Sequence, residues 1–222
     1  MNSKKRVLVL LSGRGSNFIS LYNFSQTKDS PFSIIGVISD KEQAPGLAKA
    51  KELGIETKCI TRRAKEISKE QFFHEITIAA KIFNPDIIVL AGFMRVISSE
   101  FISTFPNKII NIHPSLLPKF KGLNAQKQAL DAGETEFGCT VHFVNEFLDD
   151  GLIIAQAKVL INNHDSVETL SERILTAEHK LLPAVINSFA KNNFIINQNM
   201  IEFISKDDFP NDLDLLFPTE KK

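Results

Sequence analysis

The stretch Val7-Leu8-Val9-Leu10-Leu11-Ser12-Gly13-Arg14-Gly15-Ser16-Asn17 decides the fold class. Five apolar residues in a row suit a buried strand, and the two glycines that follow let the backbone turn tightly into a helix. The start of such a helix offers free N–H groups and a positive dipole end, so the loop predicts an anion site. Phe18 stands where a GxGxxG motif needs its third glycine, and no Gly-Lys-Ser or Gly-Lys-Thr follows. A phosphate monoester is therefore favoured over a dinucleotide or a plain tight turn. Asp40, after the second strand, stands where an acidic residue would bind a ribose, so NAD binding stays open as an alternative.

The pattern continues along the first half of the chain. Strands are expected at 7–11, 32–39, 55–60, 86–91 and 108–112, and helices at 16–26, 44–53, 68–83 and 99–104. Ser16 or Asn17 is expected to cap the first helix, and Ser68 with Gln71 has the spacing of a capping box. This alternation predicts βαβ units and a mainly parallel sheet.

The second half follows a different pattern. Residues 113–122 predict a loop, 125–132 a short helix, and 139–144 and 153–161 an antiparallel pair of strands joined through Asp149-Asp150-Gly151. A long helix is expected at 166–191, kinked at Pro183, with a short hairpin and a loose tail from residue 192. One α/β, Rossmann-like domain over 1–222 fits better than two, with antiparallel strands added in its C-terminal half.

Composition excludes several classes of protein. Of 222 residues, 26 are Lys or Arg and 26 are Asp or Glu, which argues against binding nucleic acid or an anionic membrane through bulk charge. Cys59 and Cys139 are the only cysteines, so a disulfide scaffold is excluded and a cysteine metal site is disfavoured. No apolar run is long enough to span a bilayer. The expectation is a reduced, cytoplasmic protein of enzyme size.

A polar pair ends the strand at 108–112. Asn111 and His113 are two residues apart, so they point to the same side at the carboxyl edge of the sheet, where open α/β sheets bind ligands. An amide beside an imidazole is an oxyanion-stabilising pair, whereas the alternative is a structural histidine at a strand end. The loop after His113 suggests either a flap over the reacting groups or a static connection.

Asp149 lies in the stretch Asp149-Asp150-Gly151, whose residue types favour a turn whether or not they have a function. A carboxylate brought near His113 orients the imidazole and favours its cation. His142, between apolar neighbours, is interpreted as a partly buried strand residue. His74, His164 and His179 have no partner at ligand spacing, so no metal site is predicted.

Four segments together resemble the phosphoribosylglycinamide formyltransferase family, which is folate-dependent. They are SGRGSN at 12–17, LAGFMRVIS at 90–98, NIHPSLLPKFKG at 111–122 and GCTVHFVNEFLDDG at 138–151. The resemblance implies formyl transfer from 10-formyltetrahydrofolate to glycinamide ribonucleotide in purine biosynthesis, without a metal, by a monomer or homodimer. It divides the chain into a phosphate-binding half (about 1–107) and a catalytic and folate-binding half (about 108–191).

Site residues carry over from the family position by position. The implied catalytic residues are Asn111, His113 and Asp149. The implied nucleotide-binding residues are Gly15, Ser16, Asn17 and Glu178, and the implied folate-binding residues are Lys69, Met94, Arg95, Val96, Ile97, Asn145, Glu146, Phe147 and Leu148.

Three residues depart from the family pattern. Asp150 replaces a common glycine and adds a charge beside Asp149, Asn124 replaces a common histidine, and Lys69 replaces an arginine found in some members.

Other readings stay open beside the transferase. Formyltetrahydrofolate deformylase uses a similar trio but carries an added N-terminal domain, for which a first strand starting at about residue 6 is expected to leave no room. Methionyl-tRNA formyltransferase carries an added C-terminal RNA-binding domain, which this chain is not expected to have. A nucleotide-binding module without catalysis is the alternative from another class.

Overall fold

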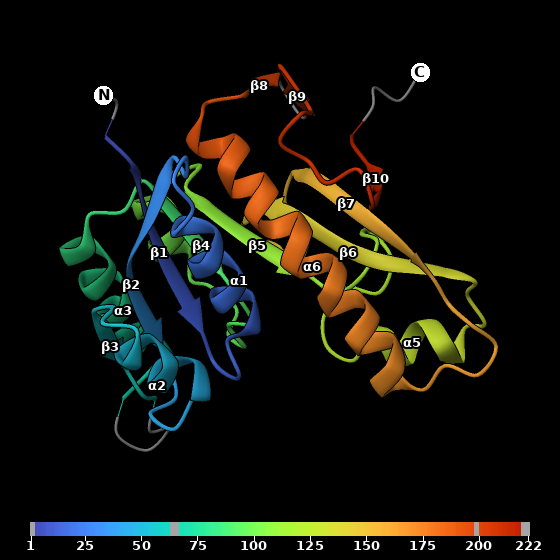
Figure 1. The fold of residues 1–222 in the computed structure, drawn as a ribbon. Helices are drawn as coiled ribbons and strands as arrows, with labels where there is room; N and C mark the ends of the chain where they lie inside the picture. The colour runs from blue at the N-terminus through green and yellow to red at the C-terminus, as the bar shows by residue number, and fades with distance from the viewer. Residues whose placement is uncertain (1–2, 63–66, 198–199, 219–222) are drawn as a thin grey trace. The chain divides into compact units, whose positions relative to one another are not determined.

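A computed structural model describes residues 3–62, 67–197 and 200–218 of the chain. The chain divides into two compact units, Met1–Asn111 and Ile112–Lys222, and the boundary falls inside one strand. Figure 1 gives the course of the chain.

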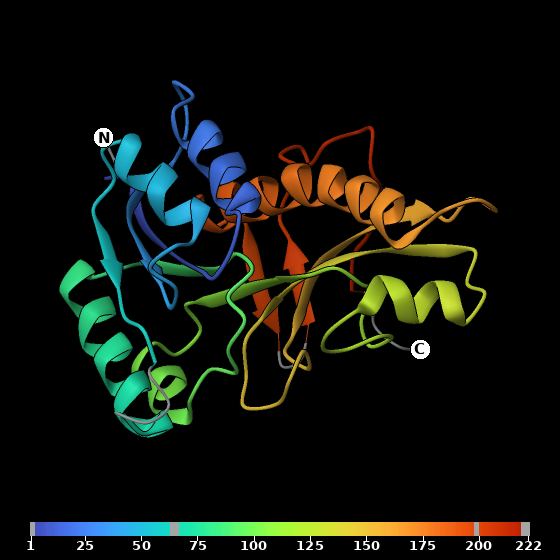
Figure 2. The ribbon, with the colours of Figure 1, turned by 90° about the horizontal axis from the view of Figure 1, so that it is seen from below.

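The first unit consists of βαβ repeats. Its elements are β1 (Lys5–Leu11), α1 (Ser16–Ser25), β2 (Phe32–Ser39), α2 (Pro45–Glu52), β3 (Thr57–Cys59), α3 (Lys69–Phe83), β4 (Ile87–Leu90), α4 (Ser99–Thr104) and the first part of β5 (Ile109–His113). The strands pair in parallel in the order β5-β4-β1-β2-β3. Figure 2 shows α1 and α2 on one side of these strands and α3 on the other. Cover on both sides explains why β4 and most of β1 are apolar without alternation.

Local signals account for α3. Its capping box is confirmed: the Gln71 backbone N–H donates to Ser68 Oγ over 3.1 Å, and the Ser68 N–H donates to Gln71 Oε1 over 3.0 Å. The helix ends at Asn84, which has a left-handed φ of 43° and precedes Pro85.

The expected cap of α1 is wrong. Neither Ser16 nor Asn17 caps the helix, because Gly15 occupies the N-cap position with a φ of 75°. A Cβ on Gly15 would lie 2.7 Å from the Cα of Gly46, and the Gly46 N–H donates to the Gly13 carbonyl over 3.0 Å. The glycine loop therefore packs directly on the start of α2, a contact that local sequence does not reveal.

The second unit holds a long helix against antiparallel strands. Its elements are the end of β5, α5 (Ala125–Asp131), β6 (Glu136–Phe143), β7 (Ile153–Leu160), α6 (Val167–Ala190), β8 (Phe194–Asn197), β9 (Met200–Phe203) and β10 (Asp214–Leu216). β6 pairs antiparallel with β7, and α6 packs on both strands (Figure 1). α6 continues through Pro183, and the expected kink there stays a prediction.

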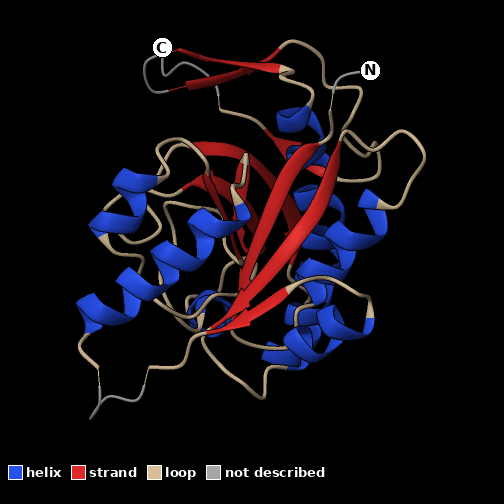
Figure 3. Cartoon of the chain, turned by 90° about the vertical axis from the view of Figure 1, so that its left-hand side faces the viewer, coloured by secondary structure: helices blue, strands red, loops and turns tan. Residues whose placement is uncertain are grey.

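In the described part of the C-terminal tail, up to residue 218, a third strand lies where the sequence predicted a loose segment. Its hairpin is confirmed as β8–β9, a separate pair of strands (Figure 3), but β10 then pairs antiparallel with β7. Lys158 on β7 lies 3.2 Å from Asp214 on β10. The Phe217 ring packs edge-on against Phe203 and Phe209, at centroid distances of 5.4 and 5.0 Å. Pairing with β7 and packing among these aromatic rings therefore hold the segment.

The fold class is confirmed as α/β, mainly parallel, with antiparallel strands in the C-terminal half. Some boundaries differ: β3 is shorter than expected, β6 begins three residues earlier at Glu136, and β5 extends to His113. β6 is longer because Glu136 already pairs with Leu160 on β7. None of the described helices is long and apolar enough to cross a membrane.

Candidate active site

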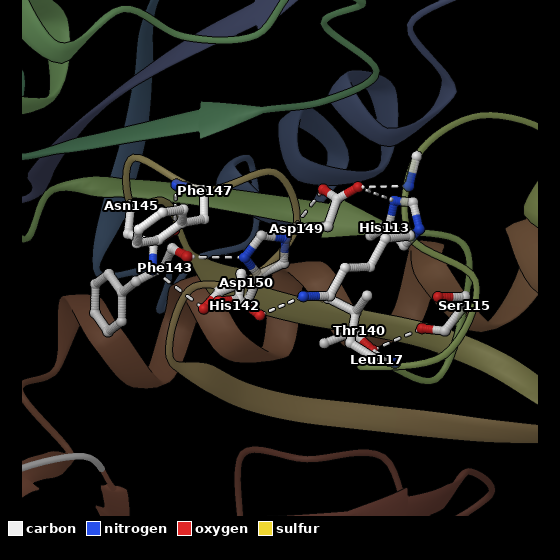
Figure 4. Close-up of polar contacts among 12 residues, drawn as sticks. His113, Ser115, Leu117, Thr140, His142, Phe143, Asn145, Phe147, Asp149 and Asp150 are labelled. Atoms are coloured by element: carbon white, nitrogen blue, oxygen red, sulfur yellow. Dashed lines mark hydrogen bonds and ion pairs between the residues drawn. The ribbon is translucent and has the colours of Figure 1, made fainter.

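His113 ends β5 as a buried side chain, and Figure 4 shows its ring beside the carboxylate of Asp149. Nε2 lies 3.0 Å from the Phe120 carbonyl oxygen, and Nδ1 lies 3.4 Å from Asp149 Oδ2. A carbonyl only accepts, so Nε2 carries a proton in this arrangement. The cationic ring can donate on both sides at once.

Asp149 is brought to His113 by the turn between β6 and β7. Its φ of 47° is left-handed, and its Oδ2 also accepts a hydrogen bond of 2.9 Å from the Gly122 backbone N–H. Its Oδ1 lies 3.8 Å from Nε2 of His142, a buried residue of β6. The carboxylate therefore stands between two imidazoles.

The proximity of His142 to Asp149 was not predicted from the sequence, which indicated a partly buried strand residue. His142 Nδ1 lies 2.8 Å from the Phe143 carbonyl oxygen. Burial is the main cause that lowers the pKa of His142, opposed by that bond and by the charge of Asp149. The one sequence signal for the orientation of His142 is the alternation of the strand, which places Thr140 and His142 on the same face of β6.

Asn111, half-buried, lies on β5 two residues before His113, and the period of a strand places both side chains on one face. β5 pairs with β4 at this point, where Asn111 faces Leu90.

The turn that carries Asp149 is held by its own residues. Asn145 Oδ1 accepts from the Phe147 N–H over 3.0 Å, and its Nδ2 donates to the Asp150 carbonyl over 3.1 Å. A Cβ on Gly151 would lie 1.7 Å from a backbone oxygen, so only glycine fits there. Three of the expected folate residues in this turn are exposed, namely Glu146, Phe147 and Leu148.

Asp150, the residue that departs from the family pattern, forms an ion pair with Lys121. Its charge is thus balanced by a lysine of the loop that follows β5. Asn124, another departure, precedes α5 with a left-handed φ of 59°.

In the first unit, Gly15, Ser16 and Asn17 form the start of α1. The helix has no side-chain cap and no acidic residue in its first turn, so its first N–H groups suit an anion. The segment Met94–Ile97 is tied to the same region, because the Met94 N–H donates to Ser12 Oγ over 2.8 Å.

Asp40, directly after β2, is bound by Arg95. Arg95 Nε donates to Asp40 Oδ2 over 2.7 Å, and its guanidinium lies 5.8 Å from the centre of the Phe72 ring. The carboxylate considered for a ribose hydroxyl is bound to an arginine of the same unit.

Lys69, three residues before Phe72 on α3, is exposed. Met94 and Val96 are exposed, and Ile97 is 9% exposed.

Glu178 is a buried residue of α6 in the second unit. Burial and the charge of Glu178 raise the pKa of the Cys139 thiol. The expected contact of Glu178 with the nucleotide stays a prediction.

Within the described ranges, no cluster of three or more His, Cys, Asp or Glu residues is arranged to hold a metal ion. The expected independence from a metal likewise stays a prediction.

These features define an α/β protein with a buried imidazole–carboxylate pair beyond a parallel strand and a helix N-terminus suited to an anion. The formyl transferase family model matches residues 5–186, and the chain belongs to that family. It is 39% identical to phosphoribosylglycinamide formyltransferase of Escherichia coli over 87% of this chain and 91% of that protein.

Two other comparisons bear on the extent of the likeness. The trifunctional purine biosynthetic protein adenosine-3 of Homo sapiens is 44% identical over 88% of this chain, which spans about a fifth (19%) of that longer protein. Glycinamide ribonucleotide transformylase 1 of Symbiobacterium toebii superposes with a TM-score of 0.87 at 37% identity, over 91% of this chain and 95% of that one.

Proposed function

We propose that this protein transfers the formyl group of 10-formyltetrahydrofolate to the amine of glycinamide ribonucleotide. The products are formylglycinamide ribonucleotide and tetrahydrofolate. The observation that carries the proposal is the Asp149 carboxylate 3.4 Å from His113 Nδ1, in a chain of the formyl transferase family. The 39% identity to the Escherichia coli enzyme over 91% of its length supports the choice of acceptor.

The residue types account for the chemistry. The substrate amine attacks the formyl carbon, the C–N bond to the folate nitrogen breaks, the amine loses one proton, and the folate nitrogen gains one. A negative charge develops on the formyl oxygen in between. Asn111 is a donor for that oxygen, the positive charge of protonated His113 stabilises it electrostatically, and Asp149 stabilises the cationic ring.

The first test is formyl transfer itself. The protein is incubated with 10-formyltetrahydrofolate, with and without glycinamide ribonucleotide. Loss of the formyl donor that requires the acceptor supports the proposal. Loss without the acceptor indicates the deformylase, and no loss indicates a binding module.

A matched pair of histidine variants then tests the role of His113. His113→Ala is expected to lower kcat by about 10²-fold or more, the usual scale for losing an acid–base or oxyanion group. His74→Ala is the control, since His74 is exposed and pairs with Glu100 on the surface. Equal kcat values for the two variants would remove His113 from the chemistry.

We propose that Gly15, Ser16 and Asn17 bind the nucleotide phosphate. A substitution at Gly15 cannot test this, because its Cβ would strike Gly46. Ser16→Asp tests it, since a carboxylate suits the first turn of a helix but repels a phosphate. The expected result is a KM for glycinamide ribonucleotide raised about tenfold or more, about 1.4 kcal/mol of binding, with folate affinity unchanged. Asn23→Asp adds the same charge at an exposed position of α1 and serves as the control.

We assign folate binding to Lys69, the segment Met94–Ile97 and the segment 145–148, and a nucleotide contact to Glu178. Lys69 is exposed and cationic, as a residue that pairs with a folate carboxylate must be. Phe147 and Leu148, at 69% and 54% exposure, offer apolar surface beside Asp149. Lys69→Met is expected to raise the KM for the folate and leave that for the nucleotide unchanged, and the reverse result would overturn the assignment.

A further inference from the structure

We infer that Thr140 and Gln156 are positioning residues for His113, a role that rests on the proposed function. Thr140 is a fully buried residue of β6. Its hydroxyl donates to the Ser115 carbonyl over 2.6 Å and accepts from the Leu117 N–H over 3.1 Å (Figure 4). It also accepts from Gln156 Nε2 over 2.8 Å, which uses one donor and both lone pairs.

Gln156, on the neighbouring strand β7, makes a further hydrogen bond to the same loop. It pairs with Thr140 in the β6–β7 register, and its Nε2 also donates to the Leu117 carbonyl over 3.0 Å. Two adjacent strand residues thus hold the backbone of residues 115–117. The bonds of Thr140 to Ser115 and Leu117 are buried, so removing its hydroxyl leaves their polar groups without water to replace it.

The held segment reaches His113 through its far end. Ser115 is fully buried, and its hydroxyl donates to the Lys119 carbonyl over 2.6 Å. The next residue, Phe120, has a left-handed φ of 56°, a conformation that a non-glycine residue adopts at a cost. Its ring packs on Phe137 of β6 at 5.9 Å. The Phe120 carbonyl so fixed is the one that accepts from His113 Nε2.

The consequence is a fixed imidazole. With Nε2 bound to the Phe120 carbonyl, the ring keeps its proton on Nε2 and turns Nδ1 toward Asp149. A hydrogen bond to one ring nitrogen of a histidine generally sets the tautomer and orientation of the ring in this way. Thr140 and Gln156 touch no reacting atom in this account. They act through residues 115–120, which these bonds hold as a fixed segment rather than a free flap.

Kinetics provide the first arm of the test. Thr140→Val is expected to lower kcat by about tenfold or more, while the KM for each substrate changes less than about twofold. Thr140→Ser, which keeps the hydroxyl, restores kcat. Thr77→Val is the matched control, because Thr77 is equally buried and its hydroxyl donates to the Phe73 carbonyl over 2.7 Å, within α3. If Thr140→Val fails to fold, Gln156→Met removes the amide alone and is expected to act in the same direction.

Nitrogen-15 NMR of the imidazole rings is the second arm, and it does not depend on activity. The His113 signals are identified by their absence in His113→Asn. In the native protein Nε2 is expected to carry the proton, and in Thr140→Val its signal shifts or broadens while Thr77→Val leaves it unchanged. An unprotonated Nε2 in the native protein, or native kcat and native signals in folded Thr140→Val, overturns the inference. Absent formyl transfer with the expected NMR result would overturn the proposed function alone.

Discussion

Asp149→Asn is expected to lower kcat by about 10²-fold while the protein stays folded. At the observed 3.4 Å between His113 Nδ1 and Asp149 Oδ2, two unit charges attract by about 5 kcal/mol at an effective dielectric constant of about 20 and by about 1.2 kcal/mol at about 80. A loss near 2.7 kcal/mol lies within that range and corresponds to about 10² in rate. Asparagine is nearly isosteric and tolerates the left-handed φ of 47° at this position, so the turn is retained.

The neighbouring carboxylate supplies the control. Asp150 forms an ion pair with Lys121, and its side chain is 50% exposed, so Asp150→Asn is expected to change kcat by less than about threefold. Steady-state kinetics with both substrates measure the effect, and circular dichroism checks the fold. Equal losses in the two variants would mean that general negative charge, rather than the pairing with His113, supports turnover. Native kcat in folded Asp149→Asn would refute the electrostatic role.

Three predictions concern stability. Gly151→Ala is expected to cost about 3 kcal/mol or more, because its Cβ would lie 1.7 Å from a backbone oxygen of β6, whereas the Cβ of Gly13→Ala meets nothing within 4 Å. Urea unfolding measures both, and equal midpoints would contradict the clash. Burial lowers the pKa of His142, so below the ordinary value of about 6.5 the unfolded chain binds more protons, and the free energy of unfolding falls as pH drops. His142→Phe should flatten the pH dependence of the free energy of unfolding between about pH 7.5 and 5.5. An unchanged slope in that variant would argue that His142 is not its source. Hydrogen bonds from Arg173, at 2.6 and 2.8 Å, lower the pKa of Asp165, so their stabilisation is complete above about pH 4 and is lost as pH falls further. Arg173→Gln should therefore lose less stability than the native protein on acidification from about pH 5 to 3, as thermal unfolding across that range will test.

Local patterns predicted the elements that depend on near neighbours. The apolar run of β1 and the capping box of α3 were read correctly because each depends on residues within one turn or one strand. The shared face of Asn111 and His113 followed from the period of a strand. The resemblance to the family then named the site residues, which no periodicity could do.

Contacts between distant positions could not be read in this way. Asp40 looked available for a ribose hydroxyl, yet its partner is Arg95, 55 positions along the chain. The tail looked loose, because nothing within residues 205–218 indicates that β10 adds to β7. His142 looked like a core residue until the turn after β6 brought Asp149 within 3.8 Å of it.

By itself, then, the sequence determined the βαβ alternation, the glycine loop at the start of a helix and the polar pair at the end of β5. Only the tertiary structure decided what surrounds that pair. The imidazole of His113 is oriented by the Phe120 carbonyl and by Asp149, which the loop after β5 and the β6–β7 turn bring to it. The physical reason is range: periodicity and capping act over a few residues, whereas burial and hydrogen bonding join whichever groups the packed chain brings within about 3 Å.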